Sequence, residues 1–161
     1  MIQRIQTVYL FLVIVFSFVA LLSPVGEWTV MGETVAECSN FTFAAYGPCA
    51  SYSSYGPFSL GILLILVMML SLLSIMLFRK RMRQLRLTIV STILLVGYCV
   101  TYAIFMYKFD MALEASAPDE NLSFHIPFVA IFPFLSIILN ILAIVGIRKD
   151  EALVRSLDRL R

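Results

Sequence analysis

Charged residues are scarce in this sequence of 161 residues, where they make up only 14% of the chain, against roughly 25% in soluble domains. The single histidine, His125, has no cysteine, histidine or acidic partner at the spacing of a metal site. The motifs G-x-S-x-G, H-E-x-x-H and the phosphate-binding loop are also absent. The sequence therefore predicts no catalytic site, no metal and no cofactor, and a non-enzymatic protein.

The scarcity of charge is greatest in four long apolar stretches, which contain no Asp, Glu, Lys or His: residues 5–22, 58–78, 85–107 and 126–147. As helices they would be about 27–35 Å long, and a bilayer has a hydrocarbon core of about 30 Å. Because a backbone in lipid must satisfy its own hydrogen bonds, we expect all four to be helices. The predicted fold class is an all-α membrane protein, a four-helix transmembrane bundle forming one domain over residues 1–161.

The basic residues predict the orientation of this bundle. Eleven of the 12 Lys and Arg residues lie in three places: Arg4, residues 79–86 and residues 148–161. The predicted outer loops, residues 23–57 and 108–125, contain seven acidic residues and only Lys108. Since basic residues are retained on the cytoplasmic side, both termini and the inner loop 79–84 are expected there. Contact with anionic lipid at that face explains the basic clusters without nucleic acid.

The tail, residues 148–161, is charged but patterned. Leu153, Leu157 and Leu160 share one helical face, which predicts an amphipathic helix along the cytoplasmic surface after the fourth span. A docking site for a partner is the alternative. The candidate residues for contact with lipid, a membrane protein partner or a second copy are Arg4, Gln6, Arg79, Lys80, Arg81, Arg83, Arg148, Lys149, Asp150, Arg155, Asp158 and Arg159.

The first outer loop is the longest segment outside the predicted membrane. Residues 27–30 and 34–37 flank Gly32 and suit a short hairpin, to which residues 41–43 could add a strand. We therefore expect a small strand-containing cap on the periplasmic side. Its aromatic residues are expected at the level of the lipid headgroups, or alternatively in a binding surface: Trp28, Phe41, Phe43, Tyr46, Tyr52 and Tyr55.

Only three cysteines are present. Cys38 and Cys49 in the outer loop could form a disulfide that closes a 12-residue loop if the outside is oxidising, or could stay unpaired. Quinone-linked thiol oxidases are also four-helix bundles, but they use a C-x-x-C motif that this chain lacks. Cys99 is expected to be a small packing residue inside the third span.

Few polar groups lie inside the predicted spans. Asn140 is the one strongly polar side chain deep in a span and should bond to another helix; a role in transport or binding is the alternative. Pro133 should bend the fourth helix near Val129. Close packing is expected at small or weakly polar residues of the second and third spans: Gly61, Ser71, Ser74, Thr88, Thr92, Cys99 and Ala103.

Both ends of the sequence resemble a known family. Residues 1–10, MIQRIQTVYL, and residues 147–161, IRKDEALVRSLDRLR, are similar to an uncharacterised family of small four-span inner-membrane proteins of Gram-negative bacteria. The resemblance implies a bacterial inner membrane with periplasmic outer loops and supplies no activity. Claudin-type proteins, with a stranded first outer loop that holds a Trp and two Cys, are similar in architecture at Trp28, Cys38 and Cys49.

Three functional hypotheses follow. The first is an accessory or scaffold subunit of an inner-membrane assembly, because the spans carry no charge apart from Arg86 at the entry of the third, no catalytic constellation is present, and both cytoplasmic ends are patterned. The second is a carrier or binding protein for a lipid or other apolar small molecule, with a groove near Pro133 and Asn140. The third is a periplasm-facing thiol-disulfide enzyme that uses Cys38 and Cys49.

Overall fold

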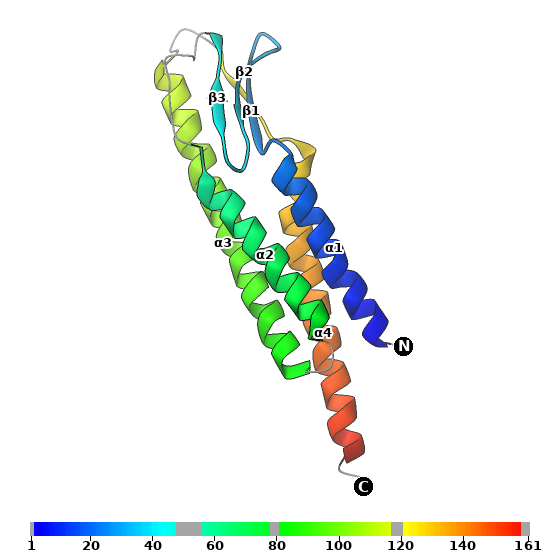
Figure 1. The fold of residues 1–161 in the computed structure, drawn as a ribbon. Helices are drawn as coiled ribbons and strands as arrows, with labels where there is room; N and C mark the ends of the chain where they lie inside the picture. The colour runs from blue at the N-terminus through cyan, green and yellow to red at the C-terminus, as the bar shows by residue number, and fades with distance from the viewer. Residues whose placement is uncertain (1, 48–55, 78–80, 117–120, 159–161) are drawn as a thin grey trace.

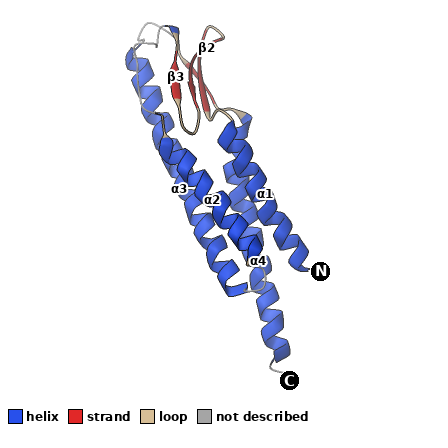
Figure 2. Cartoon of the chain, viewed as in Figure 1, coloured by secondary structure: helices blue, strands red, loops and turns tan. Residues whose placement is uncertain are grey.

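The structure is a computed structural model that describes residues 2–47, 56–77, 81–116 and 121–158. Side chains are described for all of these except residues 2–4, 116 and 153–158. Four helices stand side by side, and a small sheet lies at one end of them (Figures 1 and 2). We call this the sheet end, and the opposite end, which holds both termini, the basic end.

The four helices confirm the predicted spans. They are α1 (Ile2–Leu22), α2 (Phe58–Met76), α3 (Arg81–Ser116) and α4 (Phe132–Asp158). Each is long and apolar enough to cross a membrane, so the chain is a multi-pass membrane protein. Helix α1 packs against α2 and α4, and α3 packs against the same two helices, which closes a bundle of four.

One spacing governs burial in all four helices. Buried residues recur at alternating steps of four and three, the pattern of a left-handed coiled coil, in which one seam of each helix faces its neighbours. These positions, the bundle core, are Gln6, Leu10, Val13, Ser17 and Ala20 on α1; Leu60, Leu64, Val67, Ser71 and Ser74 on α2; Gln84, Thr88, Ser91, Leu95 and Tyr98 on α3; and Ser136, Asn140, Ala143, Ile147 and Asp150 on α4.

The packing faces of α2 and α3 agree only in part with the expectation. Gly61, Ser71 and Ser74 of α2 are buried, as expected for close packing. On α3, Thr88 is buried, but Thr92 and Cys99 are half-buried and Ala103 is exposed. Cys99 packs against the bundle core as expected, whereas the exposed Ala103 contradicts the prediction. The predicted residues are only partly buried beyond Thr88 because the steps of four and seven between them follow an edge of the buried seam.

Helix α3 is longer than its predicted span, which ended at residue 107. It has 36 residues, or about 54 Å at 1.5 Å per residue, and thus exceeds a hydrocarbon core of about 30 Å. The extra turns are helical because Phe109 and Leu113 are buried against the sheet. The first part of the expected loop 108–125 is therefore helix, and it supports the sheet.

The fourth helix differs from expectation at both ends. Pro127 precedes a 3₁₀ turn, η2 (Phe128–Ile131), and Pro133 is the second residue of α4. In a first helical turn the missing proline N–H would have had no partner anyway, so Pro133 marks the start of α4 and does not bend a continuous helix near Val129. At the basic end α4 continues past Ile147 to Asp158, so the tail extends the fourth helix instead of turning along a surface (Figure 1).

Four short antiparallel strands form the sheet: β1 (Gly26–Val30), β2 (Glu33–Cys38), β3 (Phe43–Ala45) and β4 (Ser123–His125). Their order is β3-β2-β1-β4. The β1–β2 hairpin confirms the expected turn at Gly32, where Met31 and Gly32 both have positive φ. Strand β3 begins at the last residue of the predicted segment 41–43. Strand β4, from the segment between α3 and α4, was not predicted.

One face of the sheet, which contains Trp28, packs against the C-terminal turns of α3. Trp28 is fully buried there, and its ring lies edge-on to Phe43 and Phe109. The expectation that Trp28 sits among lipid headgroups was therefore wrong, because its ring fills the core between sheet and helix. Phe43 stacks on Phe109 in the same core, whereas Tyr46 is exposed. Tyr52 and Tyr55 lie outside the described residues.

Candidate functional site

At the basic end, three of the predicted contact residues bind one another. The Gln6 side-chain amide donates to Asp150 Oδ2 at 2.9 Å, and Arg81 Nη1 donates to the Asp150 carbonyl oxygen at 3.1 Å. Gln6 and Asp150 are both buried, and Gly146 leaves room for the Gln6 side chain, which a Cβ at Gly146 would crowd at 3.0 Å. We call these three residues the latch; it ties α1 and α3 to α4.

The other predicted contact residues do not enter the latch. Arg83, Arg148 and Lys149 are exposed beside it. The structure thus separates the predicted set into a buried, internal part and an exposed basic part. Some members fall outside what is described: Arg79, Lys80 and Arg159 entirely, and Arg4, Arg155 and Asp158 in their side chains.

A line of buried polar groups crosses the bundle core between the latch and its centre. Ser74 Oγ lies 3.1 Å from Thr88 Oγ1, which joins α2 to α3. Asn140 Nδ2 donates to Ser91 Oγ at 3.2 Å, and this hydroxyl lies 3.5 Å from Ser71 Oγ. The predicted bond from Asn140 to another helix is confirmed. Such bonds add roughly 0.6–2 kcal/mol in membranes and fix which faces of the helices meet.

At the sheet end, Asn40 joins the cap to three helices. It is fully buried, and its Nδ2 donates to Ala20 O at 2.7 Å, which satisfies a carbonyl at the end of α1. Tyr98 OH donates to Asn40 Oδ1 at 3.0 Å, and Gly61 N donates to Asn40 O at 3.1 Å. Sequence reasoning missed Asn40, since a loop asparagine carries no signal of the carbonyl that it will meet.

Two further bonds and one close contact complete this junction. Trp28 Nε1 donates to Asp110 Oδ1 at 2.9 Å, and Tyr102 OH donates to Val25 O at 2.8 Å. A Cβ at Gly61 would overlap the Phe41 ring, so only glycine admits Phe41 to this position. The cap is therefore held on the bundle by side-chain bonds as well as by chain connectivity.

Cys38 has the environment of a structural residue. It is fully buried in the sheet, and its Sγ donates weakly to Ser39 O at 3.5 Å. Burial, with a smaller effect of Glu37, raises the pKa of Cys38 to about 12. Reactive thiols have lowered pKa values, because the thiolate is the nucleophile. Cys49 lies outside the described residues, so its pairing with Cys38 stays a prediction.

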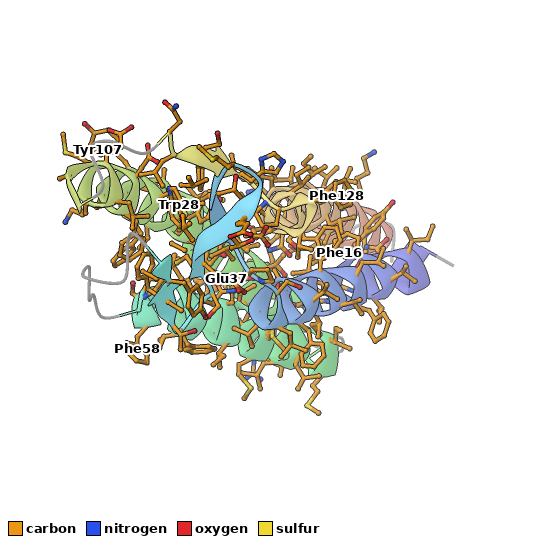
Figure 3. The ribbon with its side chains drawn as sticks, turned by 90° about the horizontal axis from the view of Figure 1, so that it is seen from above. Phe16, Trp28, Glu37, Phe58, Tyr107 and Phe128 are labelled. Atoms are coloured by element: carbon orange, nitrogen blue, oxygen red, sulfur yellow. The ribbon has the colours of Figure 1, made fainter. Side chains whose placement is uncertain are left out.

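The outer face of the sheet is acidic. Glu27 pairs with Glu37 on β2 and with His125 on β4, so these three side chains form one row across the strands. Figure 3 shows Glu37 on the side of the sheet away from Trp28. In the part of the chain that the structure describes, no three His, Cys, Asp or Glu side chains form a group that could hold a metal ion.

Comparison with known proteins gives one family. The family model described as "Domain of unknown function (DUF4293)" matches residues 2–160. No curated protein matches this chain. The match covers all four helices and the sheet, so it applies to the fold as a whole.

Proposed function

Because this chain belongs to the DUF4293 family of unknown function, we propose its role from its geometry: a non-enzymatic accessory or scaffold subunit of a larger membrane assembly. The location that we propose is a bacterial inner membrane with both termini in the cytoplasm. The grouping of 11 of the 12 Lys and Arg residues at Arg4, residues 79–86 and residues 148–161 of the sequence supports that orientation.

One observation carries the proposal: α4 projects beyond the latch. It continues from Asp150 to Asp158 past the ends of the other described helices (Figure 1). As a continuation of α4 this end needs no helix nucleus of its own, and the leucines in its sequence call for a surface to pack on. The sequence places Leu153 and Leu157 on one face and Arg155 on another, which suits an apolar groove in a partner bordered by acidic groups.

The latch supports the same role. It anchors α4 to α1 and α3 just before the projection begins, and both side chains of the Gln6–Asp150 bond are buried. A helix anchored in this way holds its projecting end in a defined direction. That lowers the ordering cost of binding, because less conformational freedom is lost when a partner docks.

Co-purification in mild detergent tests the proposal. A tagged full-length chain would be isolated from its native membrane, unchanged or with Arg155→Glu and Arg159→Glu together. The control reverses an exposed charge at the basic end of α3 that is not among the candidate contact residues, with Arg86→Glu. We expect the tail variant to lose a partner that the control variant keeps. If the tail variant retains every partner of the unchanged chain, the docking role of the tail is wrong.

The two other hypotheses have less support. Asn140 is fully enclosed by protein and bonded to Ser91, which does not favour a lipid-binding groove that includes it. The high pKa of Cys38 does not favour a thiol-disulfide enzyme. A Cys38→Ser, Cys49→Ser double variant tests both the disulfide and the enzyme hypothesis, because a pairing would give redox-dependent gel mobility that this variant lacks.

A further inference from the structure

Three buried oxygen atoms in the described part of the bundle have no hydrogen-bond partner: Ser17 Oγ on α1, and Ser136 Oγ and Asn140 Oδ1 on α4. All three residues are fully buried. Asn140 is satisfied on its nitrogen side only, through the bond to Ser91 Oγ. The unpartnered atoms therefore come from two neighbouring helices and not from scattered places.

These atoms lie within about one helical turn of one another along the α1–α4 interface. Ser136 and Asn140 are four residues apart, so they are successive members of the buried seam of α4. Ser17 follows Phe16, whose ring stacks on Phe132 with 5.1 Å between the ring centres. Phe132 is one turn before Ser136, and the seam of α1 runs antiparallel to that of α4. Ser17 thus belongs to the same region as Ser136 and Asn140.

The hydroxyls of Ser17 and Ser136 do not bond to a carbonyl of their own helix. A hydroxyl in a helix can bond to the carbonyl four residues earlier, and three threonines of α3 do so: Thr88 to Gln84 O at 3.0 Å, Thr92 to Thr88 O at 2.8 Å and Thr101 to Gly97 O at 2.8 Å. Ser17 and Ser136 make no such bond, although the same carbonyl acceptors exist on their helices. Their hydroxyls are available to a ligand between the helices.

We propose that a water molecule binds between α1 and α4, where it donates a hydrogen bond to Asn140 Oδ1 and bonds to Ser17 Oγ and Ser136 Oγ. A buried water typically makes about three hydrogen bonds to polar groups that would otherwise be unsatisfied, and three such groups occur within about one helical turn of this interface. Water is the ligand of the right chemistry, because it both donates to the amide oxygen and accepts from a hydroxyl. The neighbouring core side chains Val13, Leu95 and Ala143 offer no charge to hold an ion.

The site is enclosed on both sides along the bundle. Toward the basic end the next core positions are Val13 and Ala143, and toward the sheet end the next position on α1 is Ala20; all are almost fully buried. The proposed water is therefore a fixed part of the core. It completes the bonding of Asn140, which also connects to Ser91 of α3, so the water would link α1 to the α3–α4 contact.

Stability measurements distinguish a hydrated site from a dry one, because serine-to-alanine substitutions change the unfolding midpoint in opposite directions in the two cases. If water bridges these groups, Ser17→Ala and Ser136→Ala should each lower the unfolding midpoint in detergent, and the double variant should lose less than the sum, since both serines bind the same molecule. If the site is dry, each substitution removes an unsatisfied buried hydroxyl and the midpoint should rise. An unchanged or raised midpoint in both single variants overturns the proposal. Thr101→Val is the control, because it deletes a hydroxyl that has its own carbonyl partner.

A direct observation keeps the test decisive if a variant fails to fold. In an experimental map of the unaltered protein that resolves ordered water, we expect a peak within hydrogen-bonding distance of Asn140 Oδ1 and of at least one of the two serine hydroxyls. Well-defined side chains around Ser17, Ser136 and Asn140 with no peak between them would overturn the inference.

Discussion

Asn40 is the residue on which the sheet end depends most directly. Its side chain donates a hydrogen bond to Ala20 O at the end of α1 and accepts one from Tyr98 OH of α3. Loss of the side chain leaves these two groups without these partners. Each such group costs about 1–3 kcal/mol. We expect Asn40→Ala to lower the free energy of unfolding by about 2–4 kcal/mol, measured by denaturant titration in detergent. Ser39→Ala is the control, since the bonds of its hydroxyl to Thr42 are exposed. An equal loss in both variants would contradict the role of Asn40.

The burial of Cys38 makes a prediction about pH and reactivity. Its pKa is raised from 9.0 to about 12, so the folded state holds the thiol proton more tightly than the unfolded state. The contribution of this group to stability is therefore complete below pH 9 and is lost as the pH rises toward 12. In reduced protein at pH 8, maleimide should modify Cys38 only after unfolding. Rapid labelling of Cys38 in the folded protein, located by mass spectrometry, would contradict its burial.

The role of a single residue could be predicted from the sequence where its side chain differs from its surroundings. The interhelical bond of Asn140 was predictable, because a lone amide in an apolar span must find a partner. The roles of Asn40, Tyr98 and Asp110 were not, because they depend on which distant groups the fold brings to these residues. The latch was predicted in part: Gln6, Arg81 and Asp150 were recognised as polar groups at one end, but their mutual bonding was not.

Among the elements, the β1–β2 hairpin offers the clearest place to gain stability. Met31 has φ 50° and Gly32 has φ 89°, a pair of positive values that favours Asn-Gly at these positions. Met31 is 97% exposed, so its side chain contributes little packing. Met31→Asn should raise the free energy of unfolding by about 0.5–1 kcal/mol, because asparagine tolerates the left-handed conformation better. Thermal midpoints in detergent would show it.

The opposite substitution provides the check on that turn. Met31→Val places a β-branched residue at positive φ, which should lower the midpoint. If valine and asparagine shift the midpoint in the same direction, the backbone conformation of Met31 is not what controls the stability of the hairpin.

Element boundaries were predictable only where hydrophobicity itself changes. The start of α2 at Phe58 and the end of α1 at Leu22 coincide with such changes, and both were predicted. The outer turns of α3 contain charged residues, so hydropathy placed the end of the span near residue 107. Strand β4 has only three residues, and its strand conformation comes from pairing with β1, which no local pattern reveals.

At the scale of the whole molecule, the cap and the bundle should unfold as one unit. Trp28, the only tryptophan, is buried in the cap and bonded to Asp110 of α3. Since Asn40 also connects the cap to three helices, loss of the sheet removes interactions from the bundle. The transition followed by Trp28 fluorescence should therefore coincide with loss of helix followed by circular dichroism. Two separate midpoints would show that the cap unfolds independently.

The sequence alone does not reveal the four-and-three spacing of the bundle core, because the helices are surrounded by lipid and not by water. Lipid-facing positions of these helices are as apolar as the core, and ten of the 20 core positions are polar. The contrast between a polar outside and an apolar inside, which reveals helix faces in soluble proteins, is therefore absent. The existence of four spans was predictable from composition, whereas their contacting faces required the structure.

The pairing of β4 with β1 imposes an order on synthesis. Glu27 on β1 pairs with His125 on β4, so the edge strand β4 is missing until the ribosome has made 98 more residues after Glu27. At about 5–20 residues per second this delay is roughly 5–20 s. Two helices, α2 and α3, are synthesised during that interval, while the edge of β1 that will pair with β4 keeps its backbone groups unpaired. A chaperone on that side of the bilayer could bind the unpaired edge of β1 during this time. Pairing of β4 with β1 would then show that the chain has been synthesised up to the segment before α4.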